Sequence, residues 1–241
     1  MHSPANSSRA AFSVVFDGDD TLWSTELLYD DARSAAGEVV AAAGLDADEW
    51  EKTQRRLDVQ NVARLGYSQA RFPTSCVQAY EEVCHRAGRE PDPVVSATVR
   101  RLARSVFERD PPLVPDARDT LSRLRSQGVR LALLTKGDPE VQWRRIERSG
   151  LKDFFDVIHV VADKTPQAVR TVVAALGSDP QSTWMVGNSV RSDVLPALAA
   201  GLRAIWVDAH VWEHERSHEP VIDERVITAT HLGEVVAVTS A

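Results

Sequence analysis

Three carboxylates stand within four residues near the start of the chain, directly after a short apolar run. The run Ser13–Phe16 reads SVVF, and Asp17, Asp19 and Asp20 follow it. Carboxylates this close repel one another, which is costly unless a cation lies among them. Carboxylate and carbonyl oxygens suit Mg²⁺, which combines a few protein ligands with water and substrate phosphate. A metal-free Asp-rich turn is the alternative interpretation.

Polar residues that could bind a phosphate follow the next two apolar runs. Thr135 and Lys136 come after residues 129–134, and Lys164 comes after residues 155–161. A hydroxyl can donate to a phosphate oxygen, and an ammonium can neutralise its charge. For Lys164, a solvated lysine at the start of a helix is the alternative.

A further polar group follows the apolar run 183–186. Gly187, Asn188 and Ser189 come first, and Asp193 is close behind. In open parallel sheets, ligands bind beyond the carboxyl ends of the strands. We therefore expect these residues to gather with the earlier ones at one edge of a sheet.

The apolar runs themselves predict the fold. They are short, rich in β-branched residues and apolar on both faces, which is typical of parallel strands covered on both sides. Helical patterns at 138–149, 165–176 and 193–200 each end at a glycine and alternate with the runs. A fifth run at 204–207 completes the pattern. The sequence predicts an α/β fold with a doubly wound, parallel-sheet, Rossmann-like core.

One stretch breaks this alternation. Between residues 25 and 110 there is no convincing strand, and four helical patterns occupy 26–43, 48–65, 74–87 and 93–108. Asp92 is a suitable N-cap and Pro93 a suitable first helical residue. We predict a small all-helical domain at 25–110, a core made of 12–24 and 111–241, and a flexible leader at 1–11.

These motifs resemble those of the haloacid dehalogenase superfamily, in particular its phosphatase branch. VVFDGDDTL is similar to the first motif, with Asp at both positions, and LLTKG is similar to the second. Lys164 stands where the lysine of the third motif falls, 29 residues after Thr135, and VGNSVRSDVLPALAAG resembles the fourth motif. The resemblance covers residues 12–208. The helical insertion lies where one subclass carries its mobile cap.

The resemblance implies a Mg²⁺-dependent phosphatase that hydrolyses a small phosphomonoester through an aspartyl-phosphate. Asp17 would be the nucleophile. Asp19 would be the acid/base that protonates the leaving alcohol and then activates water. Thr135 would donate to a phosphate oxygen, and Lys164 would neutralise the nucleophile and the developing charge.

The implied metal ligands are Asp17, the Asp19 backbone carbonyl, Asn188 and Asp193. Asn188 is a departure, because the family usually has Asp at that position. The amide oxygen can still coordinate a metal but carries no charge. We expect this difference to affect metal affinity and not the class of reaction.

Four residues are candidate substrate contacts. Gly18 would keep the turn between the two catalytic aspartates free of a side chain. Lys136 could be a second phosphate contact, and an ion pair with Asp138 or Asp193 is the alternative. Arg64 and Arg71 flank a loop of the helical insertion, where they could bind a sugar, nucleotide or carboxylated substrate. A solvated basic face is the alternative for these arginines.

The presence of Asp19 also distinguishes a phosphatase from some related activities of the superfamily. Haloacid dehalogenases and phosphonatases lack an acid at this position, because their leaving groups need none. A phosphomutase keeps both aspartates, so it stays open as an alternative. A catalytically weak binding or regulatory protein is a second alternative, motivated by Asn188.

Composition excludes several other classes. The 241 residues carry 28 basic and 35 acidic side chains, a net charge of −7, which gives no support to nucleic-acid binding. No apolar run approaches the roughly 20 residues of a membrane span. Cys76 and Cys84 on one helix would lie about 12 Å apart, too far for a disulfide. We expect a cytoplasmic monomer or homodimer that acts on a small phosphorylated substrate.

A histidine-rich segment follows the fifth run. His210, His214 and His218 recur every four residues, with Glu213 and Glu215 between them. A metal site on one helix face is one interpretation. We favour a loop, part of which rims the active site.

Overall fold

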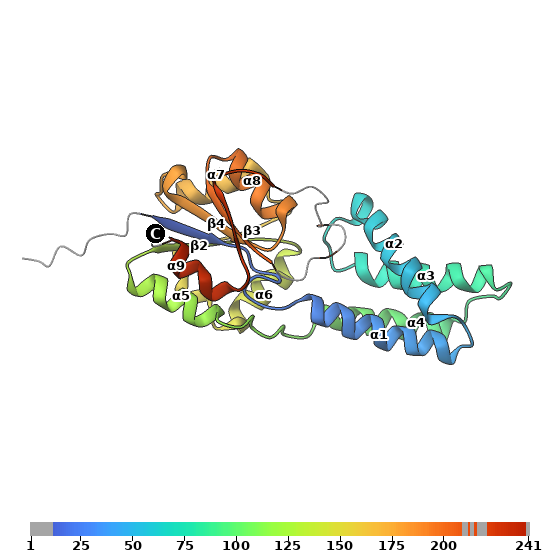
Figure 1. Ribbon diagram of the computed structural model, residues 1–241. Coiled ribbons are helices and arrows are strands. Elements are labelled where there is room, and N and C mark those ends of the chain that lie inside the picture. Colours follow the sequence, from blue (N-terminus) through green and yellow to red (C-terminus); the bar gives the residue numbers. More distant parts are fainter. Residues whose placement is uncertain (1–11, 209–211, 213–214, 216–220, 240–241) are drawn as a thin grey trace, which may run out of the picture. The chain divides into compact units, whose positions relative to one another are not determined.

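The computed structural model describes residues 12–208, 212, 215 and 221–239. Two compact units make up the chain: residues 1–24 together with 112–241, and residues 25–111 (Figure 1). The first unit contains the sheet and the second is entirely helical in secondary structure.

A parallel sheet forms the centre of the first unit. Its order in the described residues is β3-β2-β1-β4-β5-β6, and every neighbouring pair is parallel. The strands are β1 (Ser13–Phe16), β2 (Arg130–Lys136), β3 (Val157–Val161), β4 (Thr183–Gly187), β5 (Arg203–Val207) and β6 (Val226–Ala229). The α/β, Rossmann-like prediction is confirmed. Strand β6 is an addition that the sequence analysis did not identify.

Helices cover both faces of this sheet (Figure 1). They are α5 (Ala117–Ser126), α6 (Pro139–Ser149), α7 (Pro166–Ala175), α8 (Leu195–Ala199) and α9 (Val235–Thr239). Phe16 and Leu133 pack with Leu121 of α5 on one face, whereas Val15 and Leu134 pack with α7 on the other. Successive strand residues point to opposite faces, so apolar runs are needed when both faces are buried.

The helical unit contains four main helices. These are α1 (Glu26–Ala42), α2 (Ala47–Leu65), α3 (Arg71–Arg86) and α4 (Pro93–Arg104). The Asp46 side chain caps α2, and the Asp92 side chain caps α4, by accepting from backbone N–H groups of the first turn. The predicted start of the third helix at residue 74 is wrong by three residues. Pro73 lies in the first turn of α3, where a missing N–H breaks no helical hydrogen bond.

Two local details differ from the sequence expectation and affect the site. Strand β2 continues through Thr135 and Lys136, so both residues belong to the strand end. The helix expected at 193–200 begins earlier, as a π-helical turn at Val190–Val194, and continues as α8. Such turns are rare and occur frequently at functional sites.

Cys76 and Cys84 both lie on α3, where they are free and buried. None of the helices in the described residues combines the length and the apolar character that a membrane span needs.

Candidate active site

Asp17 follows β1 directly and is buried, with 5% of its surface exposed. Its backbone N–H donates to Val186 O at 2.9 Å, which fixes it against β4. Its Oδ2 accepts from the Thr21 hydroxyl at 3.0 Å, and its Oδ1 accepts from the Lys164 ammonium. Burial raises the pKa of Asp17 to about 7, although the charge of Lys164 opposes this rise.

Lys164 joins two buried carboxylates. Its Nζ donates to Asp17 and to Asp193 Oδ1, the second at 2.6 Å. Burial alone disfavours an ammonium, but the two carboxylates outweigh that effect and hold the pKa of Lys164 above its ordinary value. When both carboxylates are ionised, they share a single ammonium. Asp17, Asp193 and Lys164 together then carry one excess negative charge in a buried site.

Asp193 is placed by the turn that follows β4. Its Oδ2 accepts from the Ser189 backbone N–H at 3.0 Å, and the residue is only 1% exposed. A Cβ on Gly187 would lie 2.3 Å from the Asp193 carboxyl carbon. Only glycine therefore lets the Asp193 side chain pass this close to the strand end.

Asp19 is held by three side-chain donors. Trp23 Nε1 donates to Oδ1 at 2.7 Å, while Gln142 Nε2 and Arg145 Nη1 donate to Oδ2 at 2.8 and 3.1 Å. Gln142 and Arg145 lie three positions apart on α6, so they share a helix face. Neither residue was predicted from the sequence. The only local indication is that both are polar and stand beside Val141 and Ile146 on the buried face of α6.

Thr135 has a buried hydroxyl with unused hydrogen-bonding capacity. Its Oγ1 has no hydrogen-bond partner among the described residues, and the residue is fully buried. A Cβ on Gly18 would lie 3.2 Å from this oxygen and 2.6 Å from the Trp23 ring. Gly18 thus leaves space beside a hydroxyl that is available to a ligand. Buried polar atoms without partners are uncommon and call for such an explanation.

Lys136 forms an ion pair, as the alternative interpretation of the sequence allowed, and its partner is Glu215. Its Nζ lies 2.6 Å from Glu215 Oε1 and also donates to the Ser192 hydroxyl. Glu215 belongs to the segment after β5, and its carboxylate contacts the end of β2 and the turn that follows β4. The histidines of that segment, His210, His214 and His218, lie outside the described residues.

Arg64 and Arg71 belong to the helical unit. Arg71 Nη1 lies 3.0 Å from Asp58 Oδ2, both residues are buried, and the guanidinium also lies over the Tyr67 ring. Arg64 Nη2 donates to Asn61 Oδ1 at 3.4 Å. The structure gives both arginines contacts inside their own unit. Their role toward a substrate stays a prediction.

The oxygen donors near Asp17 fit a hard divalent cation. The Thr21 hydroxyl donates to Asp17 Oδ2 at 3.0 Å and to Asn188 Oδ1 at 3.4 Å. The Asp17 and Asn188 oxygens therefore both contact the same hydroxyl oxygen and lie near each other. In the part of the chain that the structure describes, no three Asp, Glu, His or Cys side chains form a metal cluster. A metal would therefore need the Asn188 amide and a backbone carbonyl beside Asp17 and Asp193. The excess negative charge favours a cation there.

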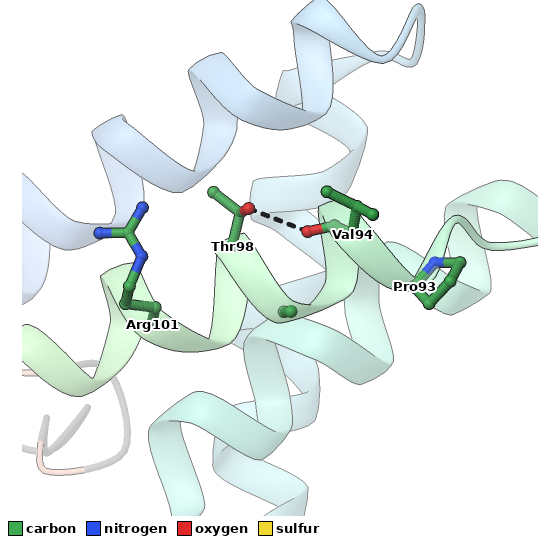
Figure 2. A pocket seen from close by; sticks show the side chains of 5 residues that line it. Pro93, Val94, Thr98 and Arg101 are labelled. Atoms are coloured by element: carbon green, nitrogen blue, oxygen red, sulfur yellow. Dashed lines mark hydrogen bonds between the residues drawn. The ribbon is translucent and has the colours of Figure 1, made fainter.

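A separate hollow of about 410 Å³ lies along α4 in the helical unit (Figure 2). Pro93, Val94, Ala97, Thr98 and Arg101 line it. Thr98 Oγ1 donates to Val94 O at 2.8 Å, a bond within the helix itself. The lining offers one cation and no carboxylate, so we do not regard the hollow as a catalytic site.

Comparisons with known proteins agree with the motifs. The family profile of the haloacid dehalogenase-like hydrolases matches residues 13–201. A glyceraldehyde 3-phosphate phosphatase from Pyrococcus abyssi is 31% identical over 80% of this chain and 79% of its own length. A phosphoserine phosphatase from Thermus thermophilus is 33% identical, but the match spans only 54% of this chain and 53% of that protein. A crystal structure of a haloacid dehalogenase-like hydrolase from Xanthomonas campestris has a TM-score of 0.78 at 25% identity, covering 95% and 91% of the two chains.

Proposed function

The chain belongs to the haloacid dehalogenase-like hydrolases, and from this premise we propose that it is a phosphatase acting on a small phosphomonoester. The named relatives support phosphoric monoester hydrolysis, because a phosphoserine phosphatase and a glyceraldehyde 3-phosphate phosphatase are among them. Their substrates differ in the leaving group and share only the phosphate. We therefore assign the class of reaction and leave the leaving group open.

The observation that carries the proposal is the contact of Lys164 with Asp17, directly after β1, and with Asp193, in the turn after β4. Phosphoryl transfer depends mainly on positioning and on the neutralisation of charge. A buried carboxylate beside a charged lysine supplies a nucleophile together with a cation that offsets the charge of the phosphate.

In the first step, an Asp17 carboxylate oxygen forms a bond to phosphorus while the bond to the leaving alcohol breaks. Protonated Asp19 gives its proton to the departing oxygen. In the second step, water attacks the aspartyl-phosphate, Asp19 takes the proton of that water, and the bond between Asp17 and phosphorus breaks. Inorganic phosphate leaves, and Asp17 returns as a carboxylate.

The other residues hold these groups and receive the phosphate. Trp23, Gln142 and Arg145 fix the Asp19 carboxyl group, and the available Thr135 hydroxyl would donate to a phosphate oxygen. Asp17, Asn188, Asp193 and the Asp19 carbonyl would hold Mg²⁺. When bound, Mg²⁺ supplies positive charge that polarises the phosphate oxygens. The helical unit would act as a cap that selects the leaving group.

The test is phosphate release from p-nitrophenyl phosphate, measured with Mg²⁺ and with a chelator. We expect release by the wild type only with Mg²⁺, and a loss of about a thousandfold or more in Asp17→Asn. Acid quenching during turnover, followed by mass spectrometry, should find a phosphoryl group on the peptide that contains Asp17. No release by the wild type, or undiminished release by Asp17→Asn, would contradict the proposal.

A further inference from the structure

Glu215 is a buried carboxylate that the proposed reaction does not yet use. It is 7% exposed, and its two oxygens have different partners. Oε1 accepts from the Lys136 ammonium at 2.6 Å. Oε2 accepts from the Ser189 hydroxyl at 2.8 Å and from the Ser192 hydroxyl. A buried carboxylate is tolerated when it is paired and hydrogen-bonded in this way.

The two serines connect Glu215 to the nucleophile. The Ser192 backbone N–H donates to the Ser189 hydroxyl at 3.0 Å, and the Ser189 backbone N–H donates to Asp193 Oδ2 at 3.0 Å. Asp193 in turn contacts Lys164, which contacts Asp17. A continuous series of hydrogen bonds and ion pairs therefore runs from the segment after β5 to the proposed nucleophile.

Side chains contact the turn in the middle of this series. It is the π-helical turn Val190–Val194, a conformation that is rare in proteins. Glu215 bridges Ser189, which caps the turn, and Ser192 within it, while Asp193 lies against Gly187. Loss of the bridge would let the turn relax and move Asp193 away from Lys164.

We propose that Glu215 is a positioning residue of the phosphatase site: it fixes the Ser189–Ser192 turn, and through it Asp193 and Lys164, with Lys136 as its counter-ion. This inference rests on the proposed function, because it assigns Glu215 a role in that reaction. It predicts an effect on turnover rather than on substrate binding, since Glu215 acts through groups that orient the nucleophile.

Glu215→Gln is the informative variant, because it keeps the size of the side chain and replaces one acceptor oxygen by a donor. Whichever way the amide lies, either Lys136 or the two serines lose their acceptor. We expect kcat on p-nitrophenyl phosphate to fall about tenfold to a hundredfold while KM stays within about twofold. Ser192→Ala should lower kcat similarly, and the double variant should be no worse than the poorer single variant.

Asp223→Asn is the matched control. Asp223 also lies between β5 and β6 and forms an ion pair with Arg225 at 2.7 Å, but it makes no contact with the serine turn among those described. Kinetics of this variant should equal those of the wild type. Unchanged kcat in Glu215→Gln, a rise in KM alone, or losses that multiply in the double variant would overturn the proposal.

Amide hydrogen exchange of residues 187–195 separates this inference from the proposed function. We expect faster exchange in Glu215→Gln than in the wild type or Asp223→Asn, because the acceptors of the Ser189 and Ser192 amides, Asp193 Oδ2 and Ser189 Oγ, are then held less firmly. This readout does not require turnover, so a wild type that releases no phosphate would refute the proposed function alone. Equal exchange in all three proteins would overturn the role of Glu215 in fixing the turn.

Discussion

The Lys164 ammonium donates a hydrogen bond to the Asp17 carboxylate, although 147 positions separate the two residues in the sequence. Both side chains are buried, and Asp193 shares the same ammonium. Ionisation of both carboxylates gives this group one negative charge in excess, and burial makes that charge costly. The ionisation of Asp17 is therefore linked both to the stability of the fold and to the binding of a cation.

The first prediction concerns the stability of the metal-free protein against pH. Burial raises the pKa of Asp17 from an ordinary value of 3.8 to about 7 in the folded state. The folded state thus holds this proton more tightly than the unfolded state, so the stabilisation is fully present below about 3.8 and is lost as the pH rises through about 7. We expect the Tm of Asp17→Asn, measured relative to that of the wild type, to rise as the pH increases from about 4 to about 7. Thermal unfolding in a chelator measures this, and a difference in Tm that does not change with pH would contradict it.

The second prediction concerns Thr135. A buried hydroxyl without a partner destabilises the ligand-free fold, so Thr135→Val should raise the free energy of unfolding by about 1 kcal/mol. The same change removes the donor proposed for a phosphate oxygen, so kcat/KM should fall about tenfold or more. Thr135→Ser keeps the hydroxyl and should retain most of the activity. A Thr135→Val protein that is less stable than the wild type, or equally active, would refute this account of the hydroxyl.

The third prediction concerns Asn188. Asn188→Asp adds a negative charge beside Asp17, since both side chains contact the Thr21 hydroxyl. Mg²⁺ affinity should tighten about tenfold, because affinity for hard cations rises with the number of charged ligands. The metal-free variant should unfold at a lower temperature than the wild type, because a third carboxylate then lies beside Asp17 and Asp193, which already share the Lys164 ammonium. Calorimetric Mg²⁺ titration and thermal unfolding check the two effects, and an unchanged titration would refute the assigned coordination.

Much of the site could be predicted from the polar residues that follow the apolar strands. Strands β2, β1 and β4 are neighbours, and Phe16 pairs with Leu133 on one side and with Val186 on the other. Residues one or two positions beyond this register, Asp17, Thr135 and Asn188, must therefore share one edge of the sheet. Apolar runs and the polar residues after them are local patterns, so they can be recognised in the sequence without knowledge of the fold.

The roles of Arg145 and Glu215 could not be predicted from the sequence, because they depend on tertiary geometry. The contact of Arg145 with Asp19 requires the rotation of α6 about its axis, and the contact of Glu215 requires the path of the chain after β5. The first leaves only a pair of polar residues on the buried face of α6, which does not show what they contact, and the second leaves no pattern that distinguishes it from a polar loop. Strand β6 was missed because it is only four residues long, follows a polar loop and lies at the edge of the sheet.

The fourth prediction concerns Arg145. Arg145→Met removes a donor that contacts both Asp19 oxygens, at 3.2 and 3.1 Å, and leaves the acid/base less firmly placed. We expect kcat to fall about tenfold to a hundredfold with little change in KM. Arg148→Met is the control, because Arg148 lies on the same helix but is exposed. Equal kinetics for the two variants would show that Arg145 does not position Asp19.

The fifth prediction concerns the buried ion pair between Asp58 of α2 and Arg71 of α3. Burial raises the pKa of Asp58, while Arg71 opposes the rise. Removal of one partner leaves the other charge buried without it, so Asp58→Asn and Arg71→Met should each destabilise the helical unit by about 3 kcal/mol. The double variant should lose much less than the sum, because it leaves neither charge behind.

Hydrogen exchange of peptides from α2 and α3 is the suitable measurement, because a chain of two units need not unfold in one step. Peptides from the sheet serve as the internal control and should keep their protection in all three variants. Losses that add in the double variant would show that the pair does not couple the two helices. A rise in KM shared by Arg71→Met and the double variant, but absent from Asp58→Asn, would assign Arg71 a direct contact with substrate in addition to its contact with Asp58.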